Sequence, residues 1–329
     1  MKPWIPQENI FKSINYKNKN YLIDLNKIVR ENNKLQILIT KNSAAKKYWN
    51  TILPFSYRVN DVIRNNYKFP LRIAIFPGVS CMFYCGFCGR NQKAKYDTSI
   101  IDDGIKRINN MISDAENGTK ISISGGLEPL TNPRLGKIIK KGSDLGYKLP
   151  LITNAYSLTE GYIKKNPELW LLDSLRVSLY GYDEESYKKI TQLDKSYKIV
   201  KKNVINFLRS RNENNKNLKV GFNFIILSEN YKNLKEVLLF IKEINNEVTN
   251  GEGINFLTLR DDYQSVTGRD ENFDKDRKYR ITNTMCEDDR QNLLEIIGDF
   301  EKLKNKHCPD LHVDYGYSLE YLSQKIFDR

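Results

Sequence analysis

The sequence predicts an α/β protein whose parallel strands form a partial (βα)6 barrel with extensions at both termini. From residue 71 onward, short apolar runs alternate with longer amphipathic stretches, which is the pattern of buried parallel strands joined by helices. The 329-residue chain is 40% hydrophobic and 11% aromatic, enough for a globular protein with a sizeable core. An open, doubly wound sheet is the less favoured alternative.

Six runs rich in Ile, Val, Leu or Phe are predicted to be the strands of this sheet. They span residues 71–76, 120–124, 149–153, 174–179, 220–227 and 254–259. Because each run is almost continuously apolar, we expect both faces of the sheet to be covered. In either arrangement of parallel strands, ligands belong at the carboxyl ends.

Helices are predicted between these strands, at residues 102–114, 134–145, 158–166, 198–210 and 234–245. Asn132 followed by Pro133 supplies a cap and a first-turn residue for the second helix. Asp183 and Asp194 are expected to cap helices in the crossover after the fourth strand.

Three segments are expected along the chain: an N-terminal extension (1–70), a barrel core (71–262) and a C-terminal segment (263–329). Helices are predicted near residues 21–30 and 44–65 of the extension. In the C-terminal segment, a helix is expected at 288–304 and a short strand near 311–315. The charged stretch 261–280 is expected to be a long loop at the end of the sixth strand.

Composition and charge exclude some classes of protein. There is no run of about 18 apolar residues and no apolar signal core near the N-terminus, so we expect a cytoplasmic protein without a membrane span. The 53 basic and 40 acidic residues give a net charge of +13, but the lysines are scattered along the chain. A nucleic-acid partner is therefore not favoured, whereas an anionic small molecule would suit a positive site.

Three of the five cysteines lie within eight residues, directly after the first predicted strand. Cys81, Cys85 and Cys88 have the spacing C-x3-C-x2-C. Three thiolates this close can hold three corners of an iron–sulfur cube and leave the fourth iron open to a small molecule. A zinc site would need a fourth ligand nearby, and the two histidines, His307 and His312, lie far downstream. A [4Fe-4S] cluster is therefore the favoured interpretation, ahead of zinc or unrelated thiols.

The segment CMFYCGFC, from Cys81 to Cys88, resembles the C-x3-C-x-aromatic-C signature of the radical S-adenosylmethionine (SAM) superfamily. The resemblance covers roughly residues 70–260, and it implies a partial (βα)6 barrel of the radical SAM type. It also implies that SAM chelates the open iron and is cleaved reductively to methionine and a 5′-deoxyadenosyl radical. Phe87 would lie against the adenine of SAM.

The second predicted strand ends in the sequence SGGLEP, which is similar to the Gly-Gly-Glu-Pro motif that binds the amino group of SAM in this family. Gly125 and Gly126 let the backbone pass close to a ligand, and Glu128 can accept from an ammonium group. The chain departs from the motif by one residue, Leu127, inserted before the acid. An ordinary capped turn is the structural alternative for Glu128.

Further SAM contacts are implied at the next two strand ends. Asn154 follows the third strand, where the family often has a polar residue near the ligand. Ser178 lies in a sequence that resembles the family's Ser-Leu-Asp-Gly strand end, with Tyr180 in place of the acid. Arg176 points to the same face as Ser178 by strand alternation, and a structural role for either residue stays open.

Residues on the fifth and sixth strands are candidates for substrate contacts. They are Asn223 and the segment 260–263, which reads Arg-Asp-Asp-Tyr. Charged side chains at the ends of barrel strands are typical of substrate sites, but a surface ion pair is an equal alternative.

The substrate class expected from the resemblance is a small molecule, either a sugar such as a nucleotide sugar or a natural-product intermediate. In such members the radical removes hydrogen from a carbinol carbon, and ammonia, water or an electron is then lost. An electron donor such as flavodoxin or ferredoxin would be the protein partner. A peptide-modifying enzyme that recognises a leader through residues 1–70, an RNA-modifying enzyme, and a non-catalytic iron–sulfur or zinc scaffold remain alternatives.

The two remaining cysteines, Cys286 and Cys308, are well separated in the sequence. Two thiols cannot hold another [4Fe-4S] cluster alone, so we expect no auxiliary cluster in residues 263–329. Buried free thiols are the expected state of both.

Overall fold

The computed structural model describes residues 11–16, 19–24, 72–85, 88, 98–113, 120–227, 229–261 and 287–314. The chain divides into two compact units, Met1–Phe69 with Tyr317–Arg329, and Pro70–Gly316. None of the helices in the described residues has the length and apolar character that a bilayer crossing needs.

The described part of the first unit is an antiparallel strand pair. β1 (Phe11–Tyr16) and β2 (Lys19–Asp24) pair in register from Phe11 opposite Asp24 to Tyr16 opposite Lys19. The helix predicted near residues 21–30 is wrong over residues 21–24, which belong to β2, because pairing with β1 satisfies the backbone there. The helix predicted at 44–65 lies outside the described residues.

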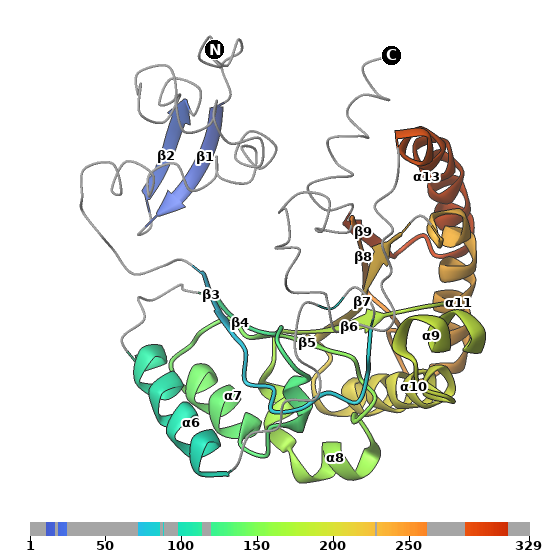
Figure 1. The fold of residues 1–329 in the computed structure, drawn as a ribbon. Coiled ribbons are helices and arrows are strands. Elements are labelled where there is room, and N and C mark those ends of the chain that lie inside the picture. The colour runs from blue at the N-terminus through green and yellow to red at the C-terminus, as the bar shows by residue number, and fades with distance from the viewer. Residues whose placement is uncertain are drawn as a thin grey trace, which may run out of the picture. The chain divides into compact units, whose positions relative to one another are not determined.

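The second unit is built on a seven-stranded sheet in which every neighbouring pair is parallel (Figure 1). In spatial order the strands are β3 (Arg72–Ile75), β4 (Lys120–Ile123), β5 (Pro150–Thr153), β6 (Ser174–Leu179), β7 (Lys219–Ile226), β8 (Phe256–Asp261) and β9 (His312–Asp314). All six predicted strands of the core are present, and the short strand predicted near 311–315 extends the sheet beyond β8. The α/β fold class and the partial barrel are confirmed.

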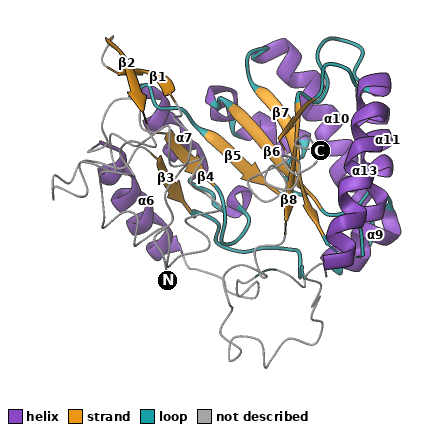
Figure 2. Ribbon diagram, turned by 90° about the horizontal axis from the view of Figure 1, so that it is seen from above, coloured by secondary structure: helices purple, strands orange, loops and turns teal. Residues whose placement is uncertain are grey.

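Helices follow the strands and cover the outer face of the curved sheet (Figures 1 and 2). They are α6 (Thr98–Ser113), α7 (Leu135–Asp144), α8 (Glu160–Lys165), α9 (Glu184–Thr191), α10 (Ser196–Asn214), α11 (Leu234–Glu247) and α13 (Glu287–His307). Short 3-10 helices are η2 (Pro129–Thr131), η3 (Pro167–Leu171) and η4 (Tyr231–Asn233). The predicted helices of the core and the one at 288–304 are each present, with ends shifted by a few residues.

The two faces of β6 have different environments. Every second residue is buried, and this set is Leu175, Val177 and Leu179. The alternate set is partly exposed and consists of Ser174, Arg176 and Ser178. Because successive side chains of a strand point to opposite faces, β6 presents its apolar side to the helices and its polar side to the inside of the curve.

Strand register aligns further polar residues with Ser178 across the sheet. Ser178 lies beside Asn223, Asn223 beside Thr258, and Thr258 beside Asp314. Thr258 Oγ1 donates to Asp314 Oδ2 over 3.4 Å. The inner face of the sheet therefore carries a row of polar side chains across four strands.

Of the two residues predicted to cap helices after the fourth strand, one does so. Asp183 caps α9, and its Oδ1 accepts from Ser186 N at 2.8 Å. The prediction for Asp194 is wrong, because the residue before α10 is Lys195, in the left-handed conformation and without a side-chain cap. Asp194 instead forms an ion pair with Lys188, 2.7 Å from Oδ1 to Nζ.

The prediction that Asn132 caps α7 is wrong, because the N-cap residue of α7 is Arg134. The Asn132 side chain still organises the turn, since its Oδ1 accepts from Arg134 N at 2.8 Å. Its Nδ2 donates to Pro77 O at 2.8 Å. Asn132 therefore ties the loop after β4 to the loop after β3.

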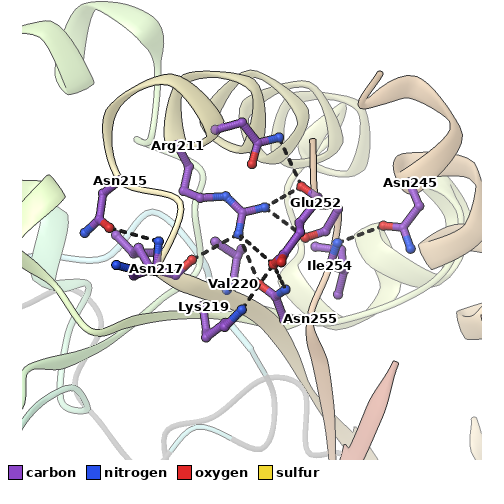
Figure 3. A network of polar contacts seen from close by, with 12 residues as sticks. Arg211, Asn215, Asn217, Lys219, Val220, Asn245, Glu252, Ile254 and Asn255 are labelled. Atoms are coloured by element: carbon purple, nitrogen blue, oxygen red, sulfur yellow. Dashed lines mark hydrogen bonds and ion pairs between the residues drawn. The ribbon is translucent and has the colours of Figure 1, made fainter. Parts of the chain in front are cut away.

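A buried arginine organises the amino-terminal ends of β7 and β8 (Figure 3). The side chain of Arg211, on α10, is fully buried. It donates to the backbone oxygens of Leu218 at 3.0 Å and Gly253 at 3.1 Å, and to that of Glu252. It also donates to Asn255 Oδ1 at 3.2 Å, so one guanidinium joins a helix to two strand entries.

Candidate active site

The cysteine segment follows β3 and is fastened to the turn after β4. Glu128 N donates to Ser80 O at 2.9 Å. Thr131 Oγ1 accepts from Val79 N at 3.2 Å and from Ser80 N at 3.1 Å. Gly78 passes so close to Leu127 that an added Cβ would meet its backbone. These contacts hold the start of the cysteine segment at the carboxyl edge of the sheet.

An aromatic side chain anchors the middle of the same segment. Phe83 is 1% exposed. Its ring makes edge-to-face contacts with Tyr156 and Tyr180, both at 5.6 Å between centroids, and with Tyr187 at 6.3 Å. Tyr84 N also donates to the carbonyl of Thr191, at the end of α9, over 3.0 Å. The backbone between the first two cysteines is thus fixed from both sides.

The three clustered cysteines are reduced thiols, and they differ in exposure. Cys85 is buried, while Cys81 and Cys88 are partly exposed. The pKa of Cys81 is raised to about 11, chiefly by burial and to a smaller extent by the charges of Glu128 and Cys88. Burial raises the pKa of Cys85 well above its usual value, and the charges of Cys88 and Cys81 add to this. The site therefore favours neutral thiols until a metal cation compensates the negative charge of the thiolates.

The donor types in the cysteine segment suit an iron–sulfur cluster. Thiolates are the usual ligands of an iron–sulfur cube, and the segment supplies three thiols. The donor set therefore fits a [4Fe-4S] cluster with three protein ligands.

Two side chains from neighbouring strand ends reach the sulfur atoms. Asn154 Nδ2 lies 3.8 Å from Cys81 Sγ and 3.1 Å from Met82 Sδ. The Tyr180 side chain makes a hydrogen bond with the Cys85 thiol. The sequence placed Asn154 near the ligand, but it gave Tyr180 no role beyond the replacement of an acid. The contact with Cys85 depends on a long-range packing that no local motif encodes.

The two glycines and the acid after β4 form a turn with defined backbone geometry and internal hydrogen bonds. Gly125 and Gly126 have φ angles of 61° and 66°, the left-handed region that favours glycine. Glu128 is 4% exposed, and one oxygen accepts from Leu130 N at 3.1 Å and Thr153 Oγ1 at 2.5 Å. Its other oxygen accepts from Asn154 N at 2.7 Å.

These internal bonds bear on the expected contact between Glu128 and SAM. A carboxylate has about four acceptor positions, and three of them are filled within the chain. One position on the oxygen that faces Asn154 N remains for an ammonium group. Burial raises the pKa of Glu128 above its usual value, against the opposing effect of its three hydrogen bonds.

The end of β5 contains a strained backbone position that the sequence did not reveal. Ala155 has a φ of 57° and is fully buried. Asn203 on α10 holds this turn, because its Nδ2 donates to Ala155 O at 3.0 Å and Tyr156 O at 2.8 Å. Left-handed non-glycine residues of this kind persist only where their surroundings fix them, and they cluster at functional sites. The turn places Asn154 beside the cysteine segment.

The remaining predicted contacts are distributed along the inner face. Ser178 is partly exposed there, one strand away from Asn154. Asn223 is 9% exposed, and its Oδ1 has no hydrogen-bond partner among the residues that the structure describes. Arg260 and Asp261 end β8. Phe87 and residues 262–263 lie outside the described residues.

A cavity of about 890 Å³ lies along the amino-terminal halves of β6 to β9. Arg176, Lys219, Phe256 and Asp314 are among its lining residues. The Arg176 guanidinium stands 5.3 Å from the centroid of the Phe256 ring, a cation–π contact. None of the three clustered cysteines lines this cavity. The cavity is therefore separate from the carboxyl edge of the sheet, where the cysteine segment lies.

The hydrogen bonds of Glu128 give a stability prediction. Glu128→Ala leaves Leu130 N and Asn154 N without their acceptor in a buried turn, and we expect it to lower the free energy of unfolding by about 2–3 kcal/mol. Since the folded-state pKa is raised above the usual 4.5, the stabilisation by Glu128 decreases as pH rises through that range. In urea titrations, Glu128→Ala should therefore lower the free energy of unfolding more at about pH 5 than at about pH 8. The exposed Glu160→Ala is the control, and equal losses for both variants would contradict the prediction.

Comparison with known proteins agrees with the geometry of this edge. The family model of the radical SAM superfamily matches residues 75–241. A curated relative is dTDP-4-amino-4,6-dideoxy-D-glucose ammonia-lyase of Streptomyces venezuelae, 34% identical over 283 residues. The match covers 84% of this chain and 55% of that enzyme, so the chain spans only about half the length of its relative.

Solved structures show the same fold at low sequence identity. The Streptococcus suis protein SuiB bound to its precursor peptide SuiA aligns with a TM-score of 0.56 and 15% identity, over 98% of this chain and 75% of that one. SuiB bound to S-adenosylmethionine aligns with a TM-score of 0.53 and 17% identity, over 94% and 71% of the two chains. At this identity the likeness extends to the fold alone.

Proposed function

The chain belongs to the radical SAM superfamily, and we propose that it removes a hydrogen atom from an amino sugar carried by a nucleotide and releases ammonia. The observation that carries the catalytic part is the set of three thiols at the carboxyl edge of a parallel sheet. The observation that carries the substrate class is the 34% identity to a dTDP-amino-sugar ammonia-lyase.

The cofactors of the family are a [4Fe-4S] cluster and SAM, and they are the cofactors of this enzyme. When bound, the cluster supplies the electron that cleaves SAM to methionine and a 5′-deoxyadenosyl radical. Cys81, Cys85 and Cys88 are the cluster ligands in this proposal. Asn154 Nδ2 lies beside the Cys81 sulfur, and the Tyr180 side chain is hydrogen-bonded to the Cys85 thiol.

Residues at successive strand ends are proposed to hold SAM. Gly125 and Gly126 let the backbone approach the methionine moiety, and Glu128 offers its remaining acceptor position to the ammonium group. Asn154 and Ser178 contribute polar contacts from β5 and β6. Phe87 covers the adenine, as the resemblance of the cysteine motif implies.

The proposed net reaction converts an amino alcohol into a ketone and free ammonia. The hydrogen atom of the carbinol carbon would end in 5′-deoxyadenosine, and the hydroxyl proton would leave with the amino group as ammonia. The neighbouring carbon would gain one electron from the reductant and one proton, so the sugar itself is neither oxidised nor reduced overall. The polar row on the inner face, which includes Ser178, Asn223 and Thr258, is suited to hold a hydroxylated substrate, and the sheet and its helices limit the access of water to a reactive radical.

The reductant and the cellular location follow from the same chemistry. We assign a flavodoxin or a ferredoxin as the electron donor, because each delivers single electrons to an iron–sulfur cluster. Three free cysteines in one short segment fit the reducing cytoplasm, where thiols stay unpaired.

The test uses the anaerobically reconstituted full chain with a chemical reductant and SAM. We expect 5′-deoxyadenosine to form, and dTDP-4-amino-4,6-dideoxy-D-glucose to increase its rate and to yield ammonia and a keto sugar. Zinc in place of iron, with no 5′-deoxyadenosine, would overturn the enzymatic assignment. Formation of 5′-deoxyadenosine that responds to a peptide or an RNA, and not to amino sugars, would overturn the substrate assignment alone.

A further inference from the structure

We propose that Tyr180 is a positioning residue that sets the reduction potential of the cluster, through a hydrogen bond from its hydroxyl group to the Cys85 sulfur. The inference rests on the proposed ligation of the cluster by the three cysteines. It concerns the electron-transfer step and is independent of the substrate.

The first step of the argument is the place of Tyr180 in the fold. It directly follows β6, at the carboxyl edge where the cysteine segment passes. Its ring contacts Phe83 edge-to-face, with centroids 5.6 Å apart and an interplanar angle of 89°. It also contacts Tyr187 on α9, at 5.8 Å and 86°. Because Phe83 lies between the first two cysteines, the two rings fix the position of the Tyr180 hydroxyl relative to that segment.

The second step is the contact of the hydroxyl group. The Tyr180 side chain is hydrogen-bonded to the Cys85 thiol, and this bond opposes the rise in the Cys85 pKa that burial causes. The phenol also interacts with the side chain of Ser178, two residues earlier on the same face of the strand. A Ser178 hydroxyl that donates to the phenol oxygen leaves the phenol hydrogen free to donate to sulfur.

The third step is the environment of the bond. Cys85 is 5% exposed, so water does not compete for its sulfur. In such surroundings a hydrogen bond is electrostatically stronger than in water. The ring contacts with Phe83 and Tyr187 keep the hydroxyl in this position.

The consequence for the cluster follows from charge. A donor that faces a ligating sulfur stabilises negative charge on it, and the reduced cluster carries one more negative charge than the oxidised cluster. Hydrogen bonds to sulfur are among the factors that set the potentials of iron–sulfur clusters. Tyr180 therefore makes the cluster easier to reduce, and it acts on the cluster through the Cys85 ligand.

The decisive experiment is a redox titration of reconstituted Tyr180→Phe, followed by electron paramagnetic resonance without substrate. We expect the equilibrium constant for one-electron reduction to fall about five- to tenfold, where tenfold is about 59 mV. Tyr187→Phe is the matched control. It removes a hydroxyl from the neighbouring ring whose bonds go to backbone groups, Ser178 O at 3.5 Å and the backbone of Tyr180, and we expect less than about a twofold change.

A potential of Tyr180→Phe equal to that of the wild type, at equal iron content, would overturn the proposal. So would an equal shift in Tyr187→Phe. A second measurement needs no variant: exchange into D₂O should shift the Raman band of the iron–cysteine stretch in the wild type, and an absent shift would also overturn it. A wild-type protein that fails to hold a [4Fe-4S] cluster would instead refute the ligand assignment.

Discussion

Replacement of Cys85 by alanine should abolish cluster binding and SAM cleavage together. The substitution removes one of three anchoring thiolates, and burial of the position limits the access of an exogenous ligand. We expect iron content and visible absorbance to fall to the background of the apoprotein, and 5′-deoxyadenosine to fall to the level without enzyme. Iron analysis and chromatography of the anaerobic reaction provide the measurements.

Cys308→Ala is the matched control for that experiment. Cys308 is also a buried free thiol, and burial raises its pKa in the same direction, but it lies after α13 and lines the separate cavity. The control should keep both iron and SAM cleavage. Retention of a cluster and of activity by Cys85→Ala would show that another residue supplies the third ligand.

Arg211→Met should cause the largest loss of stability, about 3–4 kcal/mol in the free energy of unfolding. Methionine fills a similar volume but donates no hydrogen bonds. The carbonyl oxygens of Leu218 and Gly253 therefore lose the guanidinium as a donor, and that of Glu252 keeps only its bond from Asn212. Each unsatisfied buried acceptor costs about 1–3 kcal/mol, partly offset because the cost of burying a charge disappears. Urea unfolding monitored by circular dichroism measures the change.

Arg209→Met controls for the loss of a positive charge on the same helix. Arg209 makes a single contact of this kind, at the exposed surface, from its guanidinium to Glu247 O at 2.8 Å. We expect a change below about 0.5 kcal/mol for this control. If both variants unfolded at the same urea concentration, the buried network would have no special role in stability.

Strands and the metal motif could be predicted because their signals are local. The runs 174–179 and 220–227 are apolar enough to be recognised without knowledge of their neighbours, and β6 and β7 occupy almost the same residues. The spacing of the clustered cysteines is likewise a property of eight consecutive residues. Such signals do not depend on the rest of the fold.

Elements whose conformation depends on a partner were predicted less well. Residues 21–24 have a helix-like sequence, but pairing with β1 makes them a strand. Asp194 has a side chain suited to capping, but the ion pair with Lys188 draws it away from the start of α10. In both cases a contact with another element outweighed the local propensity.

Several long-range contacts, in the fold and in the candidate site, could not be predicted from the sequence. Arg211 stands in a helix where an arginine is normally solvent-exposed, and only the fold reveals its backbone partners. The role of Asn203 in holding Ala155 joins residues 48 positions apart. The proximity of Tyr180 to Cys85 depends on ring packing around Phe83. Such contacts are set by the folded chain as a whole.

The alternation along β6 separates two kinds of evolutionary constraint. Mutations at Leu175, Val177 or Leu179 would disturb the apolar contact with the helices, so selection for folding restricts them. Ser174 and Arg176 contribute little to that contact and are not among the proposed SAM contacts, so they can diverge under selection for a new ligand. A lineage can therefore exchange one substrate for another through substitutions on one side of a strand while its ancestral scaffold is inherited unchanged.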